Sequence, residues 1–252
     1  MKLHRRSLIT GMMALLATFG ISAALYAMTV QPVVLDLTTA GRGMSQAIVV
    51  ENTFDKALPV ELRIETLELA SDGVKPTGKD TGELAVFPPQ ALIQPGQRQS
   101  FRVQYVGEPA LLRSKHFFVT VAQLPVQLPE GPSNIQLLYN FQVLVSVAAE
   151  GAKPSLSIGA VQIERNAEGA PVPVLTVANA SAAHGYLSRG RLRIIQYDAN
   201  NREVFRKQLT GPELQQTIGY GLIGGGQTRR MTLPLVLPQS DGRVEAQFTP
   251  DA

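Results

Sequence analysis

The segment IQLLYNFQVLVSV, residues 135 to 147, decides the fold class. Every odd position in it is apolar or aromatic, whereas four of its six even positions are polar. Successive side chains on a β-strand point to opposite faces, so this alternation predicts a strand and not a helix. Strands usually have about five or six residues. The excess length suggests apolar surface that one domain does not bury by itself.

The first 27 residues have the layout of an export signal. Lys2, Arg5 and Arg6 give a basic start, and an apolar stretch with small residues at its end follows. This order is typical of a signal peptide that is cut off, so residues 1–27 are excluded from the expected fold. The alternative is a retained membrane anchor, because the span approaches the roughly 18 apolar residues that cross a bilayer.

Cleavage of this signal would leave a formally neutral protein. The three cations lost with it lower the number of Lys and Arg from 23 to 20, which equals the 20 Asp and Glu of the chain. No basic block remains, so we expect neither a nucleic-acid partner nor membrane insertion of the mature chain. The chain has no cysteine. An exported protein of this sequence therefore folds without disulfides.

Short apolar runs separated by Pro, Gly, Asn and Asp follow from Met28 onward, without a long segment of helical period. This pattern is typical of an all-β sandwich protein. The expected strands of a first immunoglobulin-like unit are Val30–Leu37, Gln46–Asn52, Pro59–Leu69, Ala85–Phe87, Gln99–Val106, His116–Leu124 and Ile135–Val147.

A second series of strands follows a short segment of small and turn-forming residues, AAEGAKP, at 148–154. We interpret this segment as a hinge between domains. The sequence thus predicts two tandem immunoglobulin-like β-sandwich domains after a cleaved signal peptide, at 28–150 and 151–252. The expected strands of the second domain are Leu156–Glu164, Val172–Asn179, Leu187–Tyr197, Glu203–Leu209, Thr228–Leu237 and Val244–Phe248.

The residues that enzymes use are scarce in the mature chain. Its two histidines, His116 and His184, have no metal-ligand spacing, and we expect structural or solvated roles for both. A G-x-G-x-x-G pattern occurs at Gly219, Gly221 and Gly224, but strand-like sequence follows it where a dinucleotide site needs a helix. We therefore expect no catalysis and no cofactor.

The segment at residues 87–126 carries a family pattern. A Pro95-Gly96 turn precedes a strand with Arg102, a loop with Arg113 follows, and an aromatic strand at 116–123 ends in Leu-Pro. In this order the chain resembles the periplasmic chaperones of pilus assembly, the PapD-like family. The Glu51-Asn52 pair that closes an early strand, the long alternating strand and a second sandwich of about 100 residues add to the resemblance.

The resemblance implies a function for the long alternating strand. In that family the last strand of the first domain completes the unfinished sandwich of a pilus subunit. The donor residues here would be Ile135, Leu137, Tyr139 and Phe141. An added strand satisfies unpaired backbone groups while its alternate side chains fill pockets. Strand addition therefore has a physical basis that does not depend on the resemblance. The alternative is a purely structural role, in which this strand is only a core strand of its own domain.

The family also binds the carboxylate at the subunit's C-terminus with an arginine and a lysine between the domains. This sequence departs at both positions, where Gln31 or Pro32 and Leu144 stand. Arginine suits a carboxylate best because of its bidentate geometry. The substitutes expected here are Arg113, Arg102 and Lys115, in that order, although a solvated surface charge is the alternative for each. The departures make the chain look like the archaic or alternative branch of the family.

The sequence therefore predicts a periplasmic, non-enzymatic chaperone that binds pilus or fimbrial subunits by donating a strand and delivers them to an outer-membrane usher. It leaves open whether the subunit-free chain self-associates through the same strand. The alternative function is a structural pilus subunit or surface adhesin with tandem immunoglobulin-like modules. That alternative predicts an N-terminal donor extension and often a disulfide, and the sequence has neither.

Overall fold

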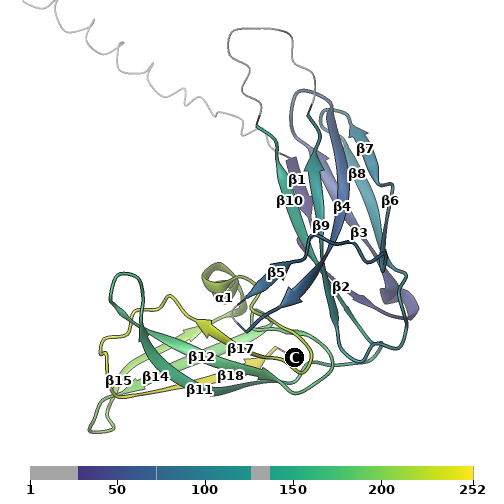
Figure 1. Ribbon diagram of the computed structural model, residues 1–252. Helices are drawn as coiled ribbons and strands as arrows, with labels where there is room; N and C mark the ends of the chain where they lie inside the picture. The colour runs from purple at the N-terminus through teal and green to yellow at the C-terminus, as the bar shows by residue number, and fades with distance from the viewer. Residues whose placement is uncertain (1–27, 72, 126–136, 252) are drawn as a thin grey trace, which may run out of the picture.

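The computed structural model describes residues 28–71, 73–125 and 137–251. These residues form two β-sandwiches that meet at an angle, so that the molecule is bent (Figure 1). The expected signal peptide and Ile135 lie outside the described residues. Within the described residues, the structure contains no helix with the length and apolar character needed to cross a membrane.

The first sandwich consists of two sheets. One has the strand order β1-β3-β8-β6, and the other has the order β2-β10-β9-β4-β5, with β7 pairing to β4. The strands are β1 (Met28–Gln31), β2 (Val34–Thr38), β3 (Ser45–Asn52), β4 (Leu58–Leu69), β5 (Val74–Pro76), β6 (Leu84–Phe87), β7 (Gln90–Ile93), β8 (Arg98–Tyr105), β9 (Lys115–Gln123) and β10 (Asn140–Ala148), and a 3-10 turn lies at Gly41–Met44.

The expected first strand at 30–37 is two strands that lie in different sheets. β1 pairs with β3 in an antiparallel manner, whereas β2 pairs with β10 in a parallel manner. Pro32 lies between them and lacks the N–H that a continuing ladder needs, which accounts for a break there. The chain thus crosses from one sheet to the other and places β2 against the last strand of the domain.

The second sandwich has strands β11 (Leu156–Arg165), β12 (Pro171–Asn179), β13 (Gly185–Tyr186), β14 (Gly190–Tyr197), β15 (Glu203–Leu209), β16 (Leu222–Ile223), β17 (Thr228–Thr232) and β18 (Arg243–Pro250), and one helix, α1 (Gly211–Ile218). Its sheets are β11-β12-β17, β15-β14-β18 and the short pair β13-β16. The helix was not expected from the sequence, and it precedes the glycine pattern at 219–224 instead of following it.

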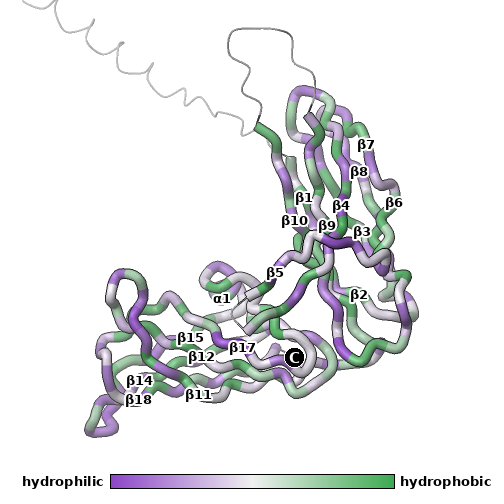
Figure 2. Tube along the Cα trace, in the orientation of Figure 1, coloured by the Kyte–Doolittle hydropathy of each residue, from purple (hydrophilic) through white to green (hydrophobic). Residues whose placement is uncertain are grey.

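Each sandwich has a hydrophobic core of its own. The first core joins residues from Met28 to Val147, with Phe101, Tyr105 and Phe117 among its largest side chains. The second joins residues from Leu175 to Val244. Hydrophobic and hydrophilic residues alternate along the strands that enclose these cores (Figure 2). Strand alternation thus accounts for both sandwiches.

The long strand is shorter in the structure than the alternation predicts. β10 begins at Asn140, and residues 137–139 precede it without regular strand structure. Its odd residues Val143, Val145 and Val147 are fully buried in the first core. The apolar positions before Asn140 therefore lie beyond the regular strand.

Candidate functional site

One edge of β10 is only half covered. Along one side β10 pairs with β9 from Asn140 to Val147, whereas along the other side β2 pairs with it only from Leu144 onward. The Leu144 N–H donates to the Val33 carbonyl at 3.0 Å and so marks where coverage begins. Among the described residues, no strand pairs with this edge from Asn140 to Val143.

The orientation of backbone groups along a strand alternates, so those of Asn140 and Gln142 point the same way as the Leu144 N–H. They face the uncovered side. A row of unpaired N–H and C=O groups at a sheet edge is a template for another strand. We call residues 137–143, with this uncovered side, the open edge.

Apolar side chains continue along the open edge beyond the buried part of β10. Phe141 and Tyr139 are half-buried and pack against the first core. Leu137 is 71% exposed, and its neighbour Leu138 is 44% exposed. Of the four donor residues expected from the sequence, the structure thus places three in a series that leads from the core to solvent, and Ile135 is outside the described residues.

The open edge ends at a cleft between the two sandwiches. The cleft has a volume of about 390 Å³ and is lined by Val33, Phe118 and Leu144 from the first domain and by Tyr220 and Arg229 from the second. It adjoins a larger groove of about 900 Å³, which passes Gln31 and Pro32 and shares Val33 and Tyr220 with the cleft. Of the positions where the family has its two cations, Leu144 therefore lines the cleft, and Gln31 and Pro32 line the adjoining groove.

Arg229 supplies a cationic group in this cleft, and sequence reasoning missed it. Arg229 lies in β17, is 9% exposed, and donates from Nη1 to the carbonyl oxygen of Leu222. Strand alternation separates it from Arg230: Arg229 shares a face with the buried Met231, whereas Arg230 is exposed and pairs with Glu164. That this face lines a cleft against the first domain follows only from the structure.

The three cations expected from the sequence lie at different places. Arg113 lies at the domain junction against Gly226. It forms no hydrogen bond or ion pair with other residues in the described ranges. Arg102 is exposed on β8 and donates from Nε to Ser45 Oγ at 2.7 Å. Lys115 forms an ion pair with Glu83. The structure therefore does not bring the three together.

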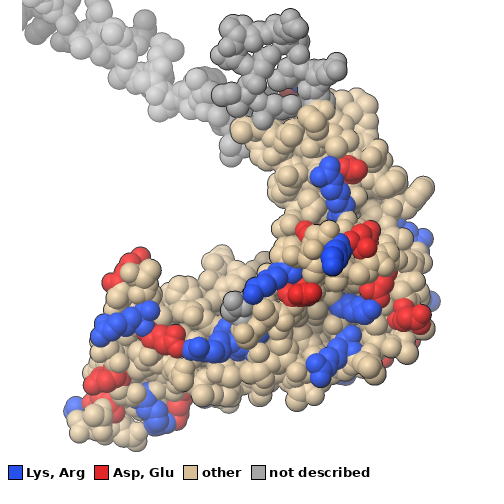
Figure 3. All heavy atoms as spheres, viewed as in Figure 1, with Lys and Arg blue, Asp and Glu red and all other residues tan. Residues whose placement is uncertain are grey.

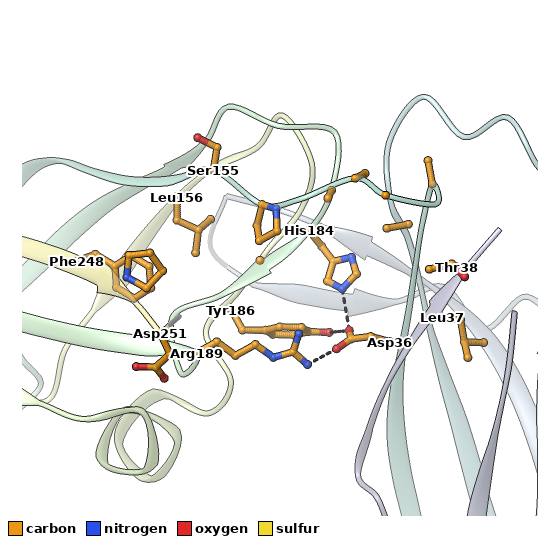
Figure 4. A pocket seen from close by; sticks show the side chains of 18 residues that line it. Asp36, Leu37, Thr38, Ser155, Leu156, His184, Tyr186, Arg189, Phe248 and Asp251 are labelled. Atoms are coloured by element: carbon orange, nitrogen blue, oxygen red, sulfur yellow. Dashed lines mark hydrogen bonds and ion pairs between the residues drawn. The ribbon is translucent and has the colours of Figure 1, made fainter. Parts of the chain in front are cut away.

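Asp36 is the centre of a polar cluster that joins the two sandwiches (Figure 4). Its Oδ1 accepts hydrogen bonds from His184 Nε2 at 2.8 Å and from the Tyr186 hydroxyl at 3.0 Å, and Arg189 pairs with its Oδ2. The Arg189 guanidinium also lies over the Tyr186 ring, 4.7 Å from its centroid. A single carboxylate of β2 thus accepts donors from three side chains of the second domain.

A chain of hydrogen bonds extends this cluster to β10 and β9. Ser146 Oγ lies 2.9 Å from the Tyr186 hydroxyl and 2.9 Å from His116 Nδ1. Because an ionised carboxylate only accepts, the consistent assignment has His116 Nδ1–H donating to Ser146, Ser146 to Tyr186, and Tyr186 to Asp36. These hydrogen bonds therefore connect the C-terminal half of β10 to the second domain.

The cluster shifts the pKa values of its members in ways that fix their charges. Burial opposes ionisation of Asp36, but the hydrogen bonds and charges of His184 and Arg189 outweigh it and lower its pKa to about 2. Burial, aided by the nearby charge of His184, lowers the pKa of His116 to about 3. Burial also raises the pKa of Tyr186. At neutral pH Asp36 is charged, whereas His116 and Tyr186 are neutral.

Among the residues that the structure describes, no other carboxylate pairs with more than one cationic side chain. On the face shown in Figure 3, basic and acidic side chains are interspersed over both sandwiches. Several ion pairs of the described residues are local in the sequence, for example Arg63 with Glu61 and Arg202 with Asp198. Apolar surface and an unpaired strand edge, and not a field of one sign, therefore distinguish the open edge.

Known structures share this two-domain arrangement, although no protein-family model and no curated protein matches the chain. CfaA, a chaperone of class 5 fimbriae, has a TM-score of 0.53 at 12% identity, with 90% of this chain and 100% of CfaA covered. The CsuC–CsuE chaperone–tip subunit complex of Acinetobacter baumannii gives 0.52 at 12%, with 88% and 97% covered. The YadV chaperone gives 0.51 at 13%, with 88% and 91% covered.

The chain has the fold of a pilus assembly chaperone. At identities this low the likeness establishes the fold alone, and the roles of individual residues rest on the geometry described above. In this chaperone fold the open edge and the cleft are neighbours, and the Asp36 cluster is one of the contacts between the domains that form the cleft.

Proposed function

We propose that this protein is a periplasmic chaperone that captures pilus subunits by adding the open edge to them and delivers them to an outer-membrane usher. The observation that carries the proposal is the open edge itself. It combines backbone groups at Asn140 and Gln142, with which no strand of the described residues pairs on this side, with the graded exposure of Phe141, Tyr139 and Leu137. The fold supports it, since CsuC binds a tip subunit in a pre-assembly complex.

Strand addition uses both properties of the open edge. A subunit that lacks one strand has a groove with unpaired backbone groups, and pairing with residues 140–143 satisfies those groups on both sides. Leu137 and its odd-numbered neighbours then enter the groove. Burial of each large apolar side chain is worth roughly 1.5–3 kcal/mol. The chaperone thus shields the subunit's core, and no cofactor or covalent step is needed.

The position of β2 limits where the added strand can go. Because β2 covers the edge of β10 from Leu144 onward, an added strand must stop or turn at the cleft. A strand that runs parallel to β10 would arrive there with its C-terminus. We propose that Arg229 binds its carboxylate, because a guanidinium in a partly desolvated cleft makes strong charge-assisted hydrogen bonds. Arg113, at the same domain junction, is the alternative.

Capture of a strand-deficient pilus subunit from the same genome, co-expressed with the chain, tests the proposal. We expect Leu137→Asp to abolish co-purification of the subunit while the chaperone stays folded, since Leu137 is 71% exposed. Leu92→Asp is the matched control. Leu92 is 61% exposed on β7, which pairs with β4 and lies away from the β10 edge of the same sheet. Equal recovery of the subunit with both variants would refute the proposal.

A further inference from the structure

Asn52 organises the loop at the tip of the first sandwich. It is fully buried at the end of β3, and its side-chain Nδ2 donates to the Ile93 carbonyl at 2.8 Å. Its backbone N–H donates to the Gln97 carbonyl at 3.0 Å, beside the turn at Gly96, where φ is +71°. Its Oδ1 accepts from the backbone N–H of Phe54 at 2.9 Å. One buried amide thus fixes the start of the loop at 53–57.

Asn179 does the same in the second sandwich. It is buried at the end of β12, and its Nδ2 donates to the Ile223 carbonyl at 3.4 Å. Its backbone N–H donates to the Gln227 carbonyl at 2.9 Å, beside the turn at Gly226, where φ is +66°. Its Oδ1 accepts from the backbone N–H of Ser181 at 3.2 Å. The two domains therefore repeat one arrangement at equivalent ends.

In the second sandwich this end is a docking surface. Gly226 lies against Arg113 of the first domain, so closely that a β-carbon there would be 3.0 Å from Arg113 Cζ. Gln227 Nε2 donates to the Leu69 carbonyl at 2.9 Å. The loop after Asn179 also carries His184, which contacts Asp36. The arrangement built on Asn179 thus holds a neighbouring sandwich.

In the first sandwich the equivalent end lies beside the open edge. The Phe54 ring is 5.9 Å from the Tyr139 ring, centroid to centroid, with an angle of 43° between their planes. Phe54 is half-buried, whereas Asp55 and Lys56 are exposed. Any domain that pairs with the open edge must therefore come close to Phe54.

We infer that the loop at 53–57 is a second docking element, which contacts the captured subunit through Phe54 next to Tyr139. The inference rests on the proposed function, and the subunit is its one occupant. The two ends are equivalent. The Asn179 end of the second sandwich contacts the first sandwich, and the Asn52 end of the first sandwich faces the place where a subunit would add. The subunit would continue the same head-to-tail series.

The inference is tested with the mature chain and the same strand-deficient subunit. Phe54→Ala is compared with Phe87→Ala, which changes a 74% exposed phenylalanine of β6, in the other sheet. We expect Phe54→Ala to weaken capture about tenfold, the effect of one well-packed interface residue, and Phe87→Ala to leave it unchanged. Equal affinities would overturn the inference.

A photo-crosslinking measurement covers the case in which Phe54→Ala does not fold. p-Benzoylphenylalanine at position 54 should crosslink to the subunit, and the same group at position 87 should not. Absence of the position-54 crosslink in a complex that still forms would overturn the inference alone. Failure of the wild-type chain to capture the subunit would instead overturn the proposed function, so the two outcomes are distinct.

Discussion

Asp36 Oδ1 lies 2.8 Å from His184 Nε2, and these two atoms belong to different sandwiches. The contact joins the strand that covers the base of β10 to the loop that Asn179 organises. Because the cleft is lined by both domains, its shape depends on the angle between the sandwiches, which this cluster holds together with contacts such as that of Gln227 with Leu69. Packing within each sandwich alone would not set that angle.

The charge of Asp36 should stabilise the fold. Its pKa is lowered from 3.8 to about 2, so its contribution is fully present above pH 4 and is lost as the pH falls towards 2. The shift corresponds to about 2 kcal/mol. We expect Asp36→Asn to reduce the free energy of unfolding by about that amount at pH 7, and the difference from wild type to shrink towards pH 2. Urea titrations at several pH values measure it, and a difference that does not vary with pH would contradict the assignment.

Neutral His116 should make the protein less stable in mild acid. Its pKa is lowered from 6.5 to about 3, so the stabilisation is present above pH 6.5 and is lost as the pH falls towards 3. The loss reaches about 3 kcal/mol at pH 4. His116→Asn keeps a donor for Ser146 but does not titrate, so its free energy of unfolding should change much less between pH 7 and 4. Parallel pH profiles for the two proteins would show that His116 is not buried as a neutral ring.

Arg229 should contribute to capture through its charge in the cleft. We expect Arg229→Ala to weaken binding of the strand-deficient subunit at least tenfold, since a lost charge-assisted hydrogen bond costs roughly 1.5–3 kcal/mol. Arg230→Ala is the matched control, because Arg230 is the next residue and lies outside the cleft. If Arg113→Ala weakens binding and Arg229→Ala does not, the carboxylate site belongs to Arg113.

Alternation in the sequence predicted the all-β fold and most strands of both sandwiches. The helix α1 was missed, although the signal was present: Thr210 and Glu213 form a capping box, with the Thr210 N–H donating to the Glu213 carboxylate at 2.8 Å. Pro32 likewise marked the break between β1 and β2. Both errors arose because apolar periodicity was considered without the helix-capping and proline signals that mark where elements begin and end.

The sequence predicted less of the candidate site than of the fold. Asp36 and His184 are 148 positions apart, and no local pattern connects them. Alternation places Arg229 on the same face as Met231, but the cleft that this face lines exists only because the two sandwiches meet there. Alternation, by contrast, placed Leu137, Tyr139 and Phe141 on one face, because strand geometry fixes which side chains share a face. Their proposed role as donor residues came from the resemblance to the chaperone family.

Amide hydrogen exchange at the open edge tests the central claim most directly. The backbone N–H groups of Asn140 and Gln142 face the side where, among the described residues, no strand pairs with them. In the subunit-free chain they should exchange quickly, whereas the Val143 amide, which faces β9, should be protected. Binding of the strand-deficient subunit should slow exchange at Asn140 and Gln142 by at least a hundredfold. A complex in which both amides still exchange as fast as in the free chain would contradict strand addition.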